Sequence, residues 1–267
     1  MTPTVESGRS FDAWASEYDR YRPTYPDALF SQIARELELP GSPQVVDVGA
    51  GTGRASIAMA SLGWLVTAVE PGGPMLDVLR SRAAEEGLPI QAVQATAEAT
   101  TLEPARFDLA TAAQAFHWFD KPAALAEMAR IVRPGGGIAL FWNVRDESRS
   151  EFVADYHRIL DRYGGAAEGK YLHAGRSSGR SLVREALEAA DGFSSPQLHE
   201  LWHELPATAD AFVGMAFTAS YIQALEPAVQ ERFRAETIEL LARHGHRGAE
   251  PFTVPYRVDL WIARRSS

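Results

Sequence analysis

Apolar residues in the first half of this chain form short runs that alternate with stretches of helical period. Five runs have the length and the β-branched content of strands, at 45–48, 65–69, 90–93, 107–112 and 138–142. Helical patterns follow at 55–62, at 74–86 and around 125–132, where Pro134 is expected to stop the helix. Strands that alternate with helices pair in parallel through right-handed crossovers. The pattern therefore predicts a doubly wound α/β sheet.

The two ends of the chain follow different patterns. Residues 11–37 are predicted to be helical, with breaks at Pro23 and Pro26 before a second helix at 27–37. In the last third we expect helices over 148–191 around a glycine-containing middle, a strand at 197–205 and further helix at 208–243. Apolar residues then alternate with polar ones over 254–262, which predicts an edge or antiparallel strand with one solvated face.

The most informative stretch is V-V-D-V-G-A-G-T-G-R at residues 45–54, a buried strand that opens directly into three alternating glycines. Glycine permits positive φ and has no Cβ, so a ligand can lie against the bare main chain. The next predicted strand ends at Glu70, which is placed to accept hydrogen bonds from both hydroxyls of a ribose. We interpret the unit as a nucleoside-binding half of the sheet.

The glycine spacing distinguishes between nucleotides. Dinucleotide folds use G-x-G-x-x-G, whereas this chain has Gly49, Gly51 and Gly53 with Ser56 three residues later. A phosphate-binding G-x-x-x-x-G-K-[ST] loop is also absent from the sequence. With this D-x-G-x-G-x-G form, the chain resembles the class I S-adenosylmethionine-dependent methyltransferases. The resemblance implies S-adenosyl-L-methionine as cofactor and a seven-stranded, mostly parallel sheet with a reversed last strand.

Composition narrows the class of protein. The chain has 267 residues, 46% of them apolar and 23% charged, and a net charge of −9. That charge argues against nucleic-acid binding, which uses clustered Lys and Arg. The lack of cysteine excludes disulfides, Cys-ligated metals and thiol nucleophiles. Without a signal-peptide pattern or an apolar stretch long enough to span a bilayer, we expect a cytoplasmic monomer or homodimer that binds no membrane and no metal.

Two further segments make the resemblance more specific. One is A-Q-A-F-H-W-F-D at 113–120 followed by L-x-E-x-x-R-I-V-R-P-G-G-G at 125–137, and the other is Y-D-R-Y-R-P-T-Y-P at 18–26. Together they resemble small-molecule methyltransferases of the trans-aconitate methyltransferase type. The resemblance implies transfer of the methyl group to a small-molecule acceptor by in-line displacement.

The glycine turn, the strand ends and the resemblance assign roles to individual residues. The expected cofactor contacts are Tyr18, Arg22, Asp47, Gly49, Ala50, Gly51, Glu70, Pro71, Met75, Thr96, Ala97 and Gln114. Residues expected to border the acceptor are Tyr21, Trp118, Trp142, Asn143 and Tyr221. His117 is a candidate general base, because an ordinary histidine pKa near 6.5 suits that role. The other histidines considered, at 173, 199, 203, 244 and 246, lack metal-ligand spacing and are expected at the surface.

The organisation expected is a single domain over residues 1–267. It comprises a helical lid at 1–40, a cofactor-binding core at 41–145, helical insertions with the sixth strand at 146–250 forming an acceptor cap, and the last antiparallel strand at 251–267. The acceptor atom stays open. The resemblance suggests a carboxylate, but a natural-product oxygen, nitrogen or carbon is equally reasonable, and so is a repurposed fold that binds the cofactor without transferring methyl.

Overall fold

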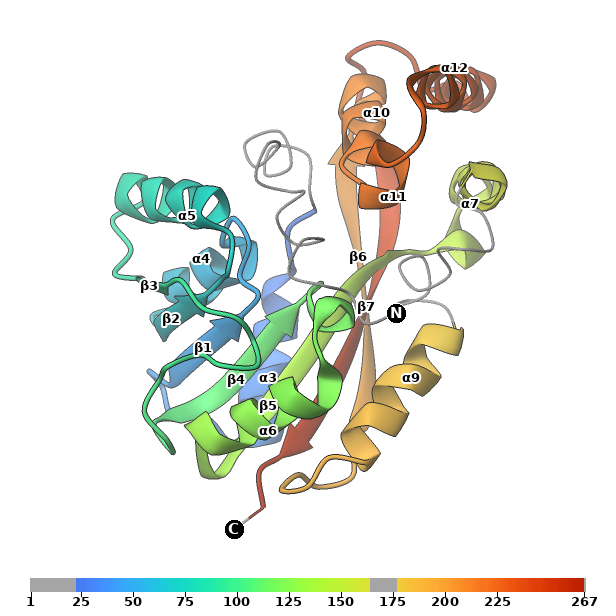
Figure 1. Ribbon diagram of the computed structural model, residues 1–267. Helices are drawn as coiled ribbons and strands as arrows, with labels where there is room; N and C mark the ends of the chain where they lie inside the picture. Colours follow the sequence, from blue (N-terminus) through green and yellow to red (C-terminus); the bar gives the residue numbers. More distant parts are fainter. Residues whose placement is uncertain (1–22, 164–176, 267) are drawn as a thin grey trace.

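The computed structural model describes residues 23–163 and 177–266 and contains a seven-stranded sheet (Figure 1). The strands lie in the order β3-β2-β1-β4-β5-β7-β6. β7 is antiparallel to both of its neighbours, whereas the pairs from β3 to β5 are parallel. Their bounds are β1 Gln44–Val48, β2 Leu65–Val69, β3 Gln91–Val93, β4 Phe107–Ala113, β5 Val132–Arg145, β6 Gln197–Ala207 and β7 Phe252–Arg264. The predicted α/β class and the reversed last strand are confirmed.

Helices cover both faces of the sheet (Figure 1). On one face lie α3 (Asp27–Leu37), α4 (Arg54–Ser61) and α5 (Gly73–Glu85), which bury residues such as Phe30, Met59 and Leu79. On the other lie α6 (Lys121–Ile131) and α9 (Ser177–Glu188), which pack on Val46, Val69 and their neighbours. Both faces of the central strands are therefore buried, as a parallel sheet requires.

The fifth strand begins earlier than the sequence predicts. Helix α6 ends at Ile131 rather than at Pro134, and β5 starts at Val132 and runs through Pro134 and three glycines. The pairing with β4 jumps from Phe107↔Val132 to Leu109↔Gly137, which marks an irregularity rather than a turn. Gly135, whose φ is +80°, donates its N–H to the carbonyl of Arg265, which directly follows β7. The irregular segment therefore stays attached to the sheet.

Helices lie around the far ends of β6 and β7 (Figure 1), and a second apolar core fills the space that they enclose. It is built by α7 (Glu151–Tyr163), α10 (Ala209–Phe217), α11 (Ser220–Gln223) and α12 (Pro227–Arg243). Phe152, Tyr156 and Phe212 form its centre through edge-on ring contacts at centroid distances of 4.8–4.9 Å. We refer to these four helices as the cap.

The last strand differs from its prediction in its surroundings. β7 lies between β5 and β6 and is buried on both faces, so it has no solvated face and β6 forms the edge. Its alternating polar position Asp259 is fully buried and accepts hydrogen bonds from Arg180 of α9 and from Arg257, each at 2.7 Å from the guanidinium Nε. The polar residue Asp259 in the alternating pattern of β7 therefore marks a buried ion pair and not a position exposed to water.

Candidate functional site

The three glycines after β1 have different surroundings. All three have positive φ, at +70° for Gly49, +56° for Gly51 and +84° for Gly53. A Cβ on Gly49 would lie 2.7 Å from the Cβ of Ala115, and one on Gly53 would lie 2.6 Å from Leu79 Cγ. At Gly51 a Cβ would meet no atom of the described residues within 4 Å. Two glycines therefore allow close packing, and Gly51 borders open space in which a ligand can lie against the backbone.

Glu70, at the end of β2, fastens this turn. Its Oε2 accepts the Gly51 N–H at 3.0 Å, and its Oε1 accepts the Gly72 N–H at 2.9 Å. Each carboxylate oxygen has a second lone pair, so the group can also accept hydroxyl hydrogens from a ligand beside Gly51. The acid that the sequence assigns to a ribose is thus adjacent to the open side of the turn.

Asp47 lies beneath the turn rather than beside a ligand. Its side chain is fully buried and accepts hydrogen bonds from Ser56 Oγ at 2.6 Å and Thr111 Oγ1 at 2.9 Å. Burial raises its pKa to about 6, although these two hydrogen bonds oppose the shift. The expected ligand contact is therefore corrected: with no exposed surface, the carboxylate instead ties β1 to α4 and β4.

The loops after β2 and β3 are joined by Gln94, which is not among the residues expected at the site. Gln94 donates from Nε2 to the carbonyl of Pro71 at 3.0 Å. Pro71 is exposed and Thr96 is half-buried, whereas Met75 and Ala97 are only 4% exposed. Of these expected cofactor contacts, Pro71, Thr96 and Ala97 lie on the two adjacent loops and Met75 lies in α5, but Met75 and Ala97 offer little accessible surface. Ala50, half-buried, completes this side of the turn.

At the end of β4 the chain takes an unusual backbone conformation. Gln114 has φ +55°, which is rare outside glycine, and its Nε2 donates to the backbone carbonyl of Asn143 at 3.1 Å. Non-glycine residues held in this region often mark functional sites. Gln114 therefore connects β4 and β5 near the carboxyl ends of these strands. Ligands of open α/β folds bind beyond the carboxyl ends of the strands.

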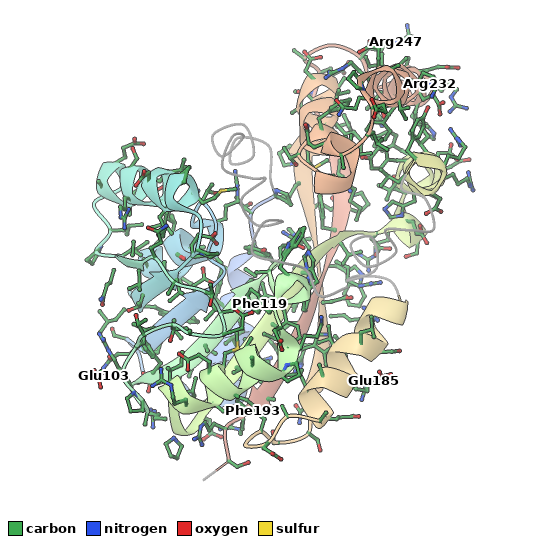
Figure 2. All side chains as sticks on the ribbon, viewed as in Figure 1. Glu103, Phe119, Glu185, Phe193, Arg232 and Arg247 are labelled. Carbon is green, nitrogen blue, oxygen red and sulfur yellow. The ribbon has the colours of Figure 1, made fainter. Side chains whose placement is uncertain are left out.

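His117 follows in the short 3-10 helix η2 (Phe116–Trp118). Its Nδ1 lies 3.5 Å from Nε1 of Trp142, and an indole nitrogen only donates. A neutral His117 consequently keeps its proton on Nε2, where it is a donor. This geometry argues against the general-base role expected for His117. Trp142 is 1% exposed, and Trp118 packs at the border of the same core as Phe119, which Figure 2 labels.

Asn143 joins three separate parts of the chain. Its Nδ2 donates to the carbonyl of Thr24 at 3.0 Å, and its Oδ1 lies 2.9 Å from Nε2 of His203 on β6. His203 is half-buried rather than at the surface, and desolvation lowers its pKa. No sequence motif includes His203, since its partner lies 60 residues away.

Several expected residues cannot be placed. Tyr18, Tyr21 and Arg22 lie outside the described residues, as does His173. Tyr221 belongs to α11, but its side chain is likewise outside what is described. Among the described residues, no cluster of three or more His, Asp or Glu has the arrangement of a metal site, and no helix has the length and apolar character needed to cross a bilayer.

Comparisons with known proteins show the family of this chain. A methyltransferase-domain family profile matches residues 45–136, from β1 to the start of β5. An uncharacterised methyltransferase of Mycobacterium tuberculosis is 31% identical over 236 residues, which cover 88% of this chain and 86% of that protein. This chain belongs to the class I S-adenosylmethionine-dependent methyltransferases.

Solved methyltransferase structures share the fold. A structure from Anaeromyxobacter dehalogenans that is assigned to the type II methyltransferases has a TM-score of 0.68 and 29% identity, over 91% of this methyltransferase and 98% of that chain. Phosphoethanolamine N-methyltransferase 2 of Haemonchus contortus, in complex with S-adenosyl-L-methionine, has a TM-score of 0.55 and 14% identity, over 97% of this chain and 60% of that one. The second likeness concerns the fold alone.

Proposed function

We propose that this methyltransferase binds S-adenosyl-L-methionine at the glycine turn and transfers its methyl group to a small-molecule acceptor. The observation that carries the proposal is the pairing of open space at Gly51 with the carboxylate of Glu70 directly beside it. A nucleoside fits such a site, because its ribose hydroxyls donate to a carboxylate while the flat base lies along bare backbone.

The cofactor supplies an activated methyl group on a sulfonium, so the protein's task is mainly to align donor and acceptor. Alignment of two reactants can contribute up to about 7–11 kcal/mol. Glu70 and the backbone of Gly49 to Gly51 hold the nucleoside, with Pro71 and Thr96 beside the base. Gln114 is proposed to hold the ends of β4 and β5 beside the position of the methyl group. Tyr18 and Arg22 are proposed to complete this side through cation–π and carboxylate contacts.

The acceptor is proposed to lie between the sheet edge and the cap. Asn143 on β5 and Trp118 in η2 are proposed to border it, with His117 beside Trp142. Tyr21, Tyr221 and the indole of Trp142 are proposed to close its other sides. A cytoplasmic location, a monomeric or dimeric state and the likeness to trans-aconitate methyltransferases stay predictions.

The test is transfer of label from methyl-labelled S-adenosyl-L-methionine to a panel of small metabolites with carboxylate, hydroxyl and amine groups. The proposal predicts a labelled product whose yield at sub-saturating cofactor falls in the Glu70→Gln variant. Tight binding of the cofactor with no labelled product from any member of a broad panel would instead favour a repurposed methyltransferase fold.

A further inference from the structure

We propose that His203 is the base of this site, which takes the proton from the attacked atom of the acceptor. The inference rests on the proposed function and deepens it, because it restricts the acceptor to a group that carries a proton there. A hydroxyl or an amine meets this condition, whereas an ionised carboxylate does not.

The position of His203 separates two apolar cores. Its neighbours on the same face of β6 are Leu201, which packs with the core under α3, and Leu205, which packs with the cap. Across β7 it pairs with Tyr256, which in turn pairs with Arg145 of β5. A polar row thus crosses the sheet where the cap core meets the sheet core, close to the strand ends that carry Gln114 and Asn143.

Two hydrogen bonds of Asn143 determine which nitrogen of His203 carries the proton. Asn143 donates through Nδ2 to the Thr24 carbonyl, and this contact directs its Oδ1 toward His203. An amide oxygen only accepts, so His203 must donate from Nε2 across the 2.9 Å separation. In the neutral ring the lone pair is then on Nδ1, and a fixed partner at the opposite nitrogen is the usual way to orient a basic histidine.

The Nδ1 atom of His203 is accessible and makes no hydrogen bond within the part of the chain that is described. Among the described residues no hydrogen-bond partner reaches it, and it is not one of the buried polar atoms that lack a partner. The titratable or charged groups that share this face on the adjacent strands are the phenol of Tyr256 and the guanidinium of Arg145. No described carboxylate forms an ion pair with His203, so burial keeps its ring neutral at pH 7.

The proposed step balances with the acceptor written as X–H. A lone pair of X forms the new bond to the methyl carbon, and the carbon–sulfur bond breaks with its electrons going to sulfur. The proton of X moves to Nδ1 of His203, which becomes an imidazolium still bonded to Asn143 through Nε2. The products are X–CH₃ and S-adenosylhomocysteine, and solvent removes the proton afterwards.

The contrast with His117 follows from the same reasoning. Trp142 donates toward His117 Nδ1, so the proton of the neutral ring stays on Nε2. In His203 the N–H at Nε2 is used in the hydrogen bond to Asn143, and the lone pair is on the accessible Nδ1. Of these two histidines beside the strand ends, His203 is therefore the one that can accept a proton.

Nitrogen NMR of the full-length protein tests the inference without an acceptor. The His203→Gln variant serves to assign the signals, because glutamine can keep an N–H donor near Asn143 while removing the titratable ring. We expect an Nε2–H tautomer at pH 7 and a pKa below 6.5. A proton on Nδ1 in the neutral ring, or a charged ring at pH 7, would overturn the proposal.

Addition of S-adenosylhomocysteine supplies the second readout. The ring signals of His203 should shift, whereas those of His246, stacked on Phe252 beside the cap core, should not. Shifts at the Gly51 amide without any at His203 would overturn this inference and leave the proposed function intact. No shift at either residue, with no binding by calorimetry, would overturn the proposed function itself.

Discussion

The carboxylate of Glu70 accepts a hydrogen bond from the backbone N–H of Gly51 at 3.0 Å, so the acid at the end of β2 is joined to the one glycine of the turn that borders open space. This contact connects a structural role with a binding role. The glycine turn is held open by the same side chain that is proposed to bind the ribose.

Glu70→Gln should therefore reduce both binding and stability. An amide in place of the carboxylate presents N–H to one of two backbone N–H donors, and one lost charge-assisted hydrogen bond costs about 1.5–3 kcal/mol. We expect at least a roughly ten-fold loss of S-adenosylhomocysteine affinity by calorimetry and a lower Tm without ligand. Glu239→Gln, an exposed change on α12, is the control. Equal affinity and equal Tm would contradict the role given to Glu70.

The glycines of the turn should respond differently to alanine. Gly51→Ala places a methyl group in open space, so it should cost only the strain of positive φ, about 1–2 kcal/mol, yet weaken cofactor binding strongly. Gly63→Ala is the control, because Gly63 also has positive φ, at +83°, and open surroundings, but lies beyond the other end of α4. If both variants bind S-adenosylhomocysteine like the unmodified protein, Gly51 does not border the ligand.

Gly53→Ala should behave in the opposite way. Its Cβ would lie 2.6 Å from Leu79 Cγ, so the Leu79 side chain or α5 must shift, and overpacking of this kind costs about 1–3 kcal/mol beyond the strain. Thermal unfolding should show a larger loss of Tm for this variant than for Gly51→Ala. The reverse order of the two Tm values would refute the packing role.

Asp47 should make stability depend on pH. Burial raises its folded-state pKa from 3.8 to about 6, so the folded protein holds this proton more tightly than the unfolded chain. Its favourable contribution is present below pH 3.8 and is lost as the pH rises through 6. The shift corresponds to about 3 kcal/mol.

Asp47→Asn removes this titration, and its amide can still bond the hydroxyls of Ser56 and Thr111. Urea unfolding of both proteins at pH 4 and pH 8 gives the comparison. The free energy of unfolding of the variant relative to the unmodified protein should increase between these pH values by up to about 3 kcal/mol. A constant difference would mean that Asp47 titrates normally.

Much of the fold follows from local patterns. The helix at 27–37 and the strand at 65–69 agree residue by residue with α3 and β2, because proline breaks and β-branched runs set their limits. The predicted start of β5 was wrong, because Pro134 and the three glycines after it normally favour a turn. There, pairing with β4 and β7 on both sides overrides the local preference.

The site was predicted less completely than the fold. The glycine turn is a contiguous motif and Glu70 directly follows the next strand, so sequence spacing could reveal both. The buried position of Asp47 depends on Ser56 and Thr111 from two other elements, and the bond between Asn143 and His203 crosses an intervening strand. Contacts of this kind arise only from tertiary packing, and a single histidine in an alternating strand carries no sign of them.

The central claim is that the glycine turn binds S-adenosylmethionine rather than a dinucleotide. Isothermal titration calorimetry of the full-length protein with S-adenosyl-L-methionine, S-adenosylhomocysteine, NAD and FAD tests it most directly. We expect saturable binding of the first two ligands, weakened in Gly51→Ala but not in Gly63→Ala, and little heat with the dinucleotides. Tight binding of NAD with no signal from S-adenosylhomocysteine would contradict it.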